Sequence, residues 1–165
     1  GFFTWLPYYL SRTLPRSVAN FALTGFIGAY VPGRLLNGYL VKKLPLTSII
    51  ITATTIIAAL LAVAFFFAGG YGQIVVIVAI GFFISTIFPN LFALATKAYP
   101  QHSGPIDGLV MTFDPLVISV IPAVMGVIAD QFSITIAMRA MIVPMIGVVL
   151  IALLLRRILA RKDTG

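Results

Sequence analysis

The stretch Leu46–Ala68, LTSIIITATTIIAALLAVAFFFA, holds 23 residues and no charged side chain. A helix that crosses a bilayer needs about 20 consecutive apolar residues, because the hydrocarbon core is about 30 Å thick. The stretch also lacks the alternation of apolar and polar residues that the strands of a membrane barrel require. It therefore predicts a transmembrane helix and an all-α membrane fold.

The composition of the whole chain also indicates a membrane protein. Of its 165 residues, 61% are hydrophobic and 9% are charged, whereas soluble domains carry about 25% charged residues. The chain has no cysteine and a single histidine, His102. This composition leaves no disulfide and little material for a metal site. We therefore expect no cofactor and no bound metal.

Further hydrophobic segments flank the central stretch, and the connections between them are short, which favours an antiparallel membrane bundle. We expect helices at about residues 1–10, 18–41, 46–68, 73–96, 108–129 and 134–155, followed by a basic cytoplasmic tail at 156–165. The first helix would be only about 15 Å long, half the thickness of a bilayer core. The chain also starts with glycine rather than methionine. We therefore expect it to begin inside a helix, as a fragment.

Basic residues collect at one end of this expected bundle. Seven of them lie at the end that holds the carboxyl terminus: Lys42, Lys43, Lys97, Arg156, Arg157, Arg161 and Lys162. Only Arg12 and Arg16 lie at the opposite end. Because basic loops stay on the cytoplasmic side, we expect a cytoplasmic carboxyl terminus in a multi-pass protein of the plasma (inner) membrane. The net charge of +7 then indicates topology and contact with the lipid bilayer, not nucleic-acid binding.

Small residues recur at every fourth position of the second segment, at Gly25, Ala29, Gly33 and Asn37. This spacing puts them on one helical face, and small residues let two helix backbones approach closely in lipid. We therefore expect this face to form a close helix–helix contact.

Prolines interrupt the expected helices at Pro32, Pro89, Pro115, Pro122 and Pro144. Such interruptions are tolerated in membranes where neighbouring helices or water satisfy the freed carbonyl groups. Each proline fits either a fixed kink in a packed bundle or a flexing helix beside a cavity. For the set as a whole, we favour flexing helices that line a cavity.

Several motifs resemble parts of one transporter family. The pattern G-R-x-x-x-G-x-x-x-x-K at residues 33–43 resembles the loop signature in the second half of the major facilitator superfamily. The sequence GFFISTIFPNLFALATKAYP (81–100) is similar to a helix of its fucose permease branch of sugar–proton symporters. DGLVMTF (107–113) and IPAVMGVIAD (121–130) are similar to the next helix of that branch.

The resemblance implies a fold of twelve helices in two six-helix halves around a central cavity. This chain would be the carboxyl-terminal half, beginning inside the seventh helix, and the missing amino-terminal half would be its partner. Such carriers alternate access by rocking one half against the other. One departure is Lys42, which stands where the commonest superfamily pattern has an aspartate. The fucose permease branch has no acid there either.

The residues of the loop signature, Gly33, Arg34, Gly38 and Lys43, are candidates for closing the cytoplasmic end together with Asp107. We expect Arg34 to contact Asp107 in one state of the carrier and to release it in the other. The alternative is that Arg34 extends to the aqueous interface and that Asp107 only caps the start of a helix.

Two other charged residues fall inside the expected spans. Asp114 lies seven residues after Asp107, about 10 Å deeper along the same helix. A carboxyl group at that depth is costly and marks a functional site by default, so we expect Asp114 to bind substrate and to couple transport to protons. The alternative is a protonated aspartate that is hydrogen-bonded to a neighbouring helix. Arg139 we expect to pair with Asp130 in a structural role.

Four further side chains are candidates for substrate binding. Trp5 and Tyr8 can stack on the apolar face of a sugar, although anchoring at the membrane interface fits them better. Asn37 and Asn90 can bind a sugar hydroxyl or, equally well, form hydrogen bonds between helices.

These features favour secondary active transport of a small solute. The chain has no phosphate-binding glycine loop, no nucleophile beside a base and no cluster of metal ligands, so we expect no enzyme. The resemblance implies sugar–proton symport driven by a proton gradient, with this chain as half of the carrier. The alternatives are a drug or lipid efflux carrier on the same fold, and a helix bundle or remnant without transport activity.

Overall fold

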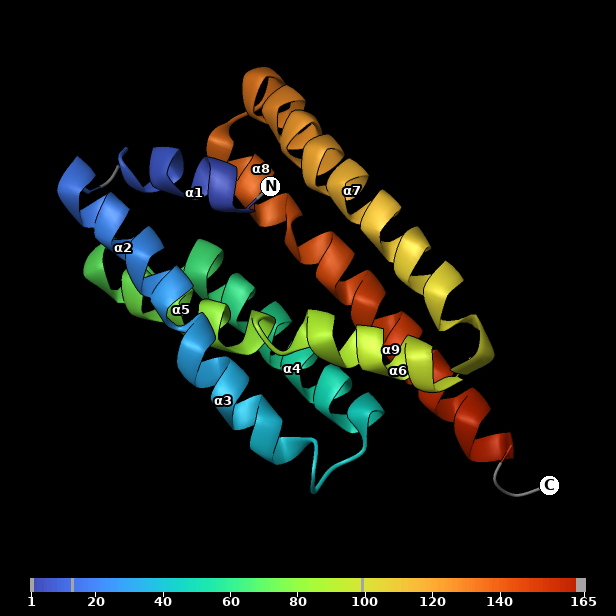
Figure 1. The fold of residues 1–165 in the computed structure, drawn as a ribbon. Helices are drawn as coiled ribbons and strands as arrows, with labels where there is room; N and C mark the ends of the chain where they lie inside the picture. The colour runs from blue at the N-terminus through green and yellow to red at the C-terminus, as the bar shows by residue number, and fades with distance from the viewer. Residues whose placement is uncertain (1, 13, 99, 163–165) are drawn as a thin grey trace.

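The computed structural model describes residues 2–12, 14–98 and 100–162, and every regular element in these ranges is a helix (Figure 1). The all-helical prediction is therefore confirmed. The elements are α1 (Phe2–Leu10), α2 (Arg16–Gly28), α3 (Tyr30–Leu40), α4 (Leu46–Ala62), the π-helix η1 (Val63–Phe67), α5 (Gly70–Ile84), α6 (Ile87–Ala98), the 3-10 turn η2 (Pro100–His102), α7 (Ser103–Gln131), α8 (Ile134–Ala140) and α9 (Ile142–Lys162).

Three of the expected spans are divided into two helices, and each division lies three residues before a proline. The divisions are Ala29 before Pro32, Thr86 before Pro89, and Met141 before Pro144. A proline has no N–H group, and its ring collides with the carbonyl four residues earlier, so the helix is interrupted there.

The fifth span behaves differently from these three. Helix α7 continues through Pro115 and Pro122, so these two prolines do not divide it, and a kink or flexing at them stays a prediction. The basic segment expected as a tail is helical as far as Lys162, and residues 163–165 lie outside the described part of the chain.

In the described part of the chain, four helical segments are long and apolar enough to cross a membrane: Leu46–Phe67, Gly70–Ala98, Ser103–Gln131 and Ile134–Leu154. The expected span at 18–41 is helical as α2 and α3 but is not among the four. It carries Asn20, Arg34 and Asn37, which lower its hydropathy. Residues 18–41 are therefore a more polar pair of helices, α2 and α3, and that they form a membrane span stays a prediction.

Helix α4 lies at the centre of the bundle. It packs against α5, α6 and α9, and it buries six side chains, Ile49, Ile50, Ala53, Thr54, Ile57 and Leu61. Helix α7 lies at the margin, where it packs mainly against α8 (Figure 1). Of the residues in its most hydrophobic stretch, 6% are buried inside the chain, against 44% for Leu46–Phe67.

Helices α2 and α3 cross α5 at very short range through glycines. A Cβ atom added at Gly33 would overlap the carbonyl oxygen of Phe82 and the hydroxyl of Ser85. A Cβ atom at Gly81 would overlap the carbonyl oxygen of Phe26. The prediction that the small-residue face forms a close helix contact is therefore confirmed, and α5 is its partner.

Candidate functional site

Two asparagines form a buried amide pair between α3 and α6. The amide of Asn90 donates to Oδ1 of Asn37 at 2.7 Å, and the amide of Asn37 donates to Oδ1 of Asn90 at 3.3 Å. The side chains are 7% and 2% exposed for Asn37 and Asn90. Their position one turn beyond the Gly33 crossing puts each within reach of the other. The pair therefore joins the two divided helices, and each amide is occupied by its partner rather than open to a solute.

Trp5 connects α1 to α7. Its indole Nε1 donates to the carbonyl oxygen of Pro122 at 3.0 Å. The ring also covers Gly126, where an added Cβ atom would lie 3.2 Å from the indole. Gly126 therefore provides the space in which the indole reaches the α7 backbone. Trp5 contacts Tyr8 edge to face, with ring centroids 6.0 Å apart.

A polar cavity of about 230 Å³ lies between α1 and α2. It is lined by Tyr8 and Ser11 from the α1 side and by Arg16 and Asn20 from α2. The guanidinium of Arg12 donates to the Tyr8 hydroxyl at 2.7 Å, which fixes the hydroxyl at the rim. Hydroxyl, amide and guanidinium groups gathered in one cavity can bind a polar solute.

Sequence reasoning identified Tyr8 but missed Ser11, Arg16 and Asn20. A signal was present, since Arg16 and Asn20 stand four residues apart at the start of a hydrophobic helix and so share one face. Their contact with Tyr8 depends on how α1 packs against α2, which spacing along the chain does not reveal.

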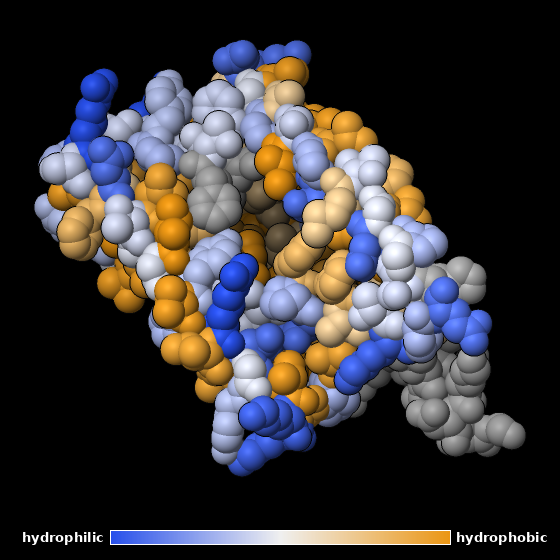
Figure 2. Space-filling model, viewed as in Figure 1, coloured by the Kyte–Doolittle hydropathy of each residue, from blue (hydrophilic) through white to orange (hydrophobic). Residues whose placement is uncertain are grey.

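Asp114 lies on an exposed face of α7. No hydrogen bond or ion pair joins its carboxylate to another side chain among the described residues. The nearby hydroxyls of Thr112 and Ser119 donate to backbone carbonyls of their own helix, at 2.7 and 2.9 Å. Figure 2 shows hydrophilic residues in the space between α3 and α7, beside a largely hydrophobic outer side of α7. Asp114 is thus an open acid on a membrane-length helix.

The structure does not join Arg34 to Asp107. In the ranges 2–12, 14–98 and 100–162 no ion pair links them, and the Arg34 guanidinium lies 6.0 Å from the Tyr30 ring centroid. Helix α7 begins at Ser103, so Asp107 lies inside the helix and the capping alternative is wrong. Pro105 explains the early start, because proline fits the first turn of a helix. Oδ1 of Asp107 is buried and has no hydrogen-bond partner in the described structure.

The other residues of the loop signature differ in their surroundings. Gly33 is at the close crossing, whereas Gly38 has open space around it. The ammonium of Lys43 lies 4.5 Å from the Tyr39 ring centroid, a cation–π contact at the end of α3.

Arg139 and Gln73 hold the π-helix η1. Arg139 Nε donates to the carbonyl of Phe65 at 3.0 Å, and the Gln73 amide donates to the carbonyl of Ala64 at 2.7 Å. The structural role expected for Arg139 is therefore confirmed, but its partner is a backbone carbonyl and not Asp130. A π-helix leaves carbonyl groups that side chains can satisfy, and no pattern in the sequence predicts this element.

The described residues contain no group of three or more His, Cys, Asp or Glu that could hold a metal ion. The side chain of His102 lies outside the described part. The features that remain are a polar cavity, an open acid and close helix crossings in a membrane bundle. The family model of the Major Facilitator Superfamily matches residues 1–164.

The chain belongs to the major facilitator superfamily. No curated protein and no solved structure matches it. As a member of the superfamily with apolar, membrane-length helices, it is an integral multi-pass membrane protein. Members of the superfamily transport solutes across membranes and are generally carriers without enzyme activity.

Proposed function

We propose that this chain is the carboxyl-terminal six-helix half of a carrier that imports a sugar together with protons. The resemblance of residues 81–100, 107–113 and 121–130 to the fucose permease branch supports this branch and a sugar as the solute. The carrier lies in the plasma (inner) membrane, with the carboxyl terminus in the cytoplasm, because basic residues collect at that end. An amino-terminal half of six helices completes the central cavity.

The observation that carries this proposal is the contrast between the hydropathy of α7 and its burial. Helix α7 is long and apolar enough to cross a membrane, yet only 6% of its most hydrophobic stretch is buried. It also carries Asp114 on an exposed face. Ionisable residues within a membrane face a water-filled cavity or another protein segment, because contact with lipid is too costly. This favours a pathway beside α7 that the other half of the carrier covers.

The polar cavity between α1 and α2 supports a sugar as the solute. Tyr8, Ser11 and Asn20 supply hydroxyl and amide groups for hydrogen bonds to sugar hydroxyls. Trp5, packed edge to face on Tyr8, adds an aromatic surface for the apolar face of a sugar ring. Asn37 and Asn90 can take part only in a state in which their mutual hydrogen bonds open.

Asp107 supports a change of state at the opposite end. A buried carboxylate oxygen without a hydrogen-bond partner is costly, and Oδ1 of Asp107 is in this position. We propose that Arg34 reaches Asp107 when the cytoplasmic end closes, with Gly33, Gly38 and Lys43 shaping the moving end of α3. The contact is then a latch that the present arrangement leaves open.

Uptake measurements on the complete carrier test the proposal. Membrane vesicles are given an inward proton gradient, and entry of radiolabelled monosaccharides is followed with and without a protonophore. We expect sugar uptake to depend on the proton gradient. We also expect Asp114→Asn to reduce this uptake at least tenfold. Asp130→Asn is the control, because Asp130 is exposed at the end of the same helix.

Three results would contradict parts of the proposal. Sugar uptake that ignores the protonophore removes proton coupling. Equal uptake by both variants removes Asp114 from the mechanism. Extrusion of amphiphilic dyes without any sugar uptake favours the efflux alternative.

A further inference from the structure

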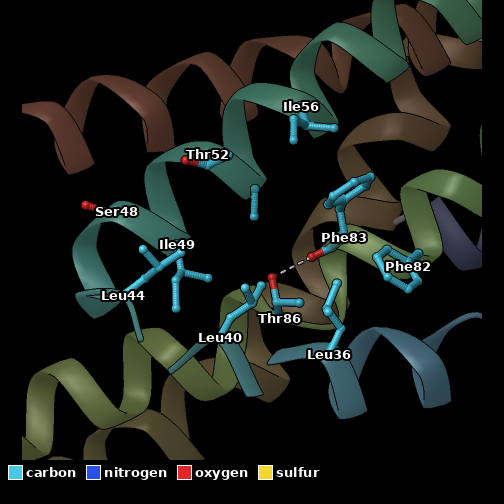
Figure 3. Close-up of a pocket in the computed structure, with 11 residues that line it drawn as sticks. Leu36, Leu40, Leu44, Ser48, Ile49, Thr52, Ile56, Phe82, Phe83 and Thr86 are labelled. Atoms are coloured by element: carbon cyan, nitrogen blue, oxygen red, sulfur yellow. Dashed lines mark hydrogen bonds between the residues drawn. The ribbon is translucent and has the colours of Figure 1, made fainter. Parts of the chain in front are cut away.

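A second cavity lies away from Asp114 and the polar cavity, between α3, α4 and α5. Its volume is about 260 Å³, and most of its lining is aliphatic or aromatic, from Leu36, Leu40, Ile49, Ile56 and Phe83 (Figure 3). Figure 3 shows these side chains pointing into the space between the helices. We call this space the α3–α4 groove.

The hydroxyl groups of the groove give little polarity to its inner part. The Thr86 hydroxyl donates to the carbonyl of Phe83 at 2.8 Å, within the wall (Figure 3). Ser48 and Thr52 lie on α4 within its first two turns. An occupant that is apolar over most of its length therefore fits the groove.

Two lysines stand at one end of the groove. Leu40 and Leu44 both line it, and Lys42 and Lys43 lie between them in the sequence, exposed on the α3–α4 connection. Residues 1–106 contain no aspartate or glutamate, so the helices that form the groove supply no acid to neutralise this pair. Figure 2 shows hydrophilic residues gathered at this lower end of the bundle.

We propose that the α3–α4 groove binds one anionic phospholipid, with an acyl chain along α4 and the phosphate on Lys42 and Lys43. Length supports this occupant, because Ile56 lies ten residues beyond Leu46, a rise of about 15 Å, which is half the bilayer core. An acyl chain of one leaflet covers the same depth. A phosphate group complements the paired positive charge, which a hydrophobic helix of a protein partner does not.

The inference requires only that the chain resides in a membrane, and it holds whatever solute is transported. Each lysine near an anionic surface contributes about 1 kcal/mol, so two lysines correspond to roughly a 30-fold preference over a zwitterionic lipid. The preference should therefore depend on the headgroup, and retention should depend on free space in the groove.

Native mass spectrometry of the detergent-solubilised protein tests both requirements. The protein is titrated with phosphatidylglycerol or with phosphatidylcholine of identical acyl chains, and the fraction carrying one lipid is measured. We expect phosphatidylglycerol to bind at least tenfold more tightly. Lys42→Gln with Lys43→Gln should abolish the difference, whereas Lys97→Gln, at the end of α6, should change it less than twofold.

A substitution inside the groove separates a built site from general attraction of lipid to lysines. Thr52→Phe places a ring in the groove and should reduce phosphatidylglycerol binding at least fivefold. Thr55→Phe is the matched control, because Thr55 is exposed on α4 but does not line the groove. Equal binding of the two lipids would overturn the proposal, and so would equal effects of Thr52→Phe and Thr55→Phe. The proposal would also fail if the protein formed dimers that added lipid does not separate, because a second copy would then occupy the groove.

Discussion

Two membrane-length segments of this chain have opposite surroundings. Leu46–Phe67 and Ser103–Gln131 are both long and hydrophobic enough to cross a bilayer. The first lies among α5, α6 and α9 and buries six side chains of α4. The second buries only Met125 and packs mainly against α8. The hydropathy of a segment thus predicts that its surroundings are apolar. It does not show whether those surroundings are neighbouring helices, lipid or the second half of a carrier.

The difference between the two segments comes from small residues and polar anchors. The helices around α4 approach one another through Gly33 and Gly81, where backbones touch, and are joined by the Asn37–Asn90 pair. Among the described residues, helix α7 has one comparable anchor, Trp5 on Gly126 and the Pro122 carbonyl. We therefore expect perturbations of the packed region to affect global stability and perturbations of α7 to affect its position.

The largest effect on the packed region should come from Gly33→Ala. The added methyl group would overlap the Phe82 carbonyl oxygen and the Ser85 hydroxyl, so α3 and α5 must separate. We expect the free energy of unfolding to fall by about 3 kcal/mol, as for severe overpacking. Unfolding in mixed micelles, followed by far-ultraviolet circular dichroism, measures it.

Gly38→Ala is the matched control on the same helix. Gly38 has open space around it, so alanine should be neutral or should stabilise α3 by up to about 1 kcal/mol through its better helix propensity. Equal losses at Gly33 and Gly38 would show that the backbones do not touch at Gly33.

A smaller effect should follow from Asn90→Leu. The change leaves the buried Asn37 amide without its partner, and we expect a loss of about 1.5 kcal/mol, between the values for membrane hydrogen bonds and for unsatisfied buried groups. Asn37→Leu with Asn90→Leu removes both polar groups and should recover part of this loss. The free energies of unfolding of the two single variants and the double variant form a double-mutant cycle that tests the Asn37–Asn90 interaction. If the loss in the double variant equals the sum of the losses in the two single variants, the side chains do not interact.

The sequence predicted the packed region better than it predicted α7. The spacing of Gly25 and Gly33 identified the contact face, because a helical period maps directly onto a surface. The sequence left the roles of Asn37 and Asn90 open between solute and helix contact, since composition alone does not identify a partner. The structure supplies that partner. Three prolines did end helices, as their chemistry requires.

The predictions that failed concern choices among distant partners. Charge favours Asp130 as the partner of Arg139, but the π-helix, which has no sequence signature here, offers a backbone carbonyl instead. Hydropathy predicts a helix start at Asp107, but a polar turn with Pro105 extends α7 outward from there. Hydropathy marks where a membrane span fits, and helices continue beyond it.

The smallest effect on global stability, with the clearest local consequence, should follow from Trp5→Phe. Phenylalanine keeps the ring over Gly126 but cannot donate to the Pro122 carbonyl, so we expect a loss below about 1 kcal/mol. The position of α7 should become less defined. The chain has no cysteine, so spin labels at Thr55→Cys and Ser119→Cys report the distance between α4 and α7 by pulsed electron paramagnetic resonance. We expect a broader distance distribution.

Tyr71→Phe controls for the removal of a polar group from an aromatic residue, because Tyr71 is far from α7 in the sequence and its side chain is 67% exposed. It should leave the distribution unchanged. Gly126→Leu provides a second test, since its side chain would displace the indole from α7 and should broaden the distribution further. If neither Trp5→Phe nor Gly126→Leu changes the distribution, then α7 is held by contacts other than Trp5. The contrast between a firmly packed α4 and a singly anchored α7 would then be wrong.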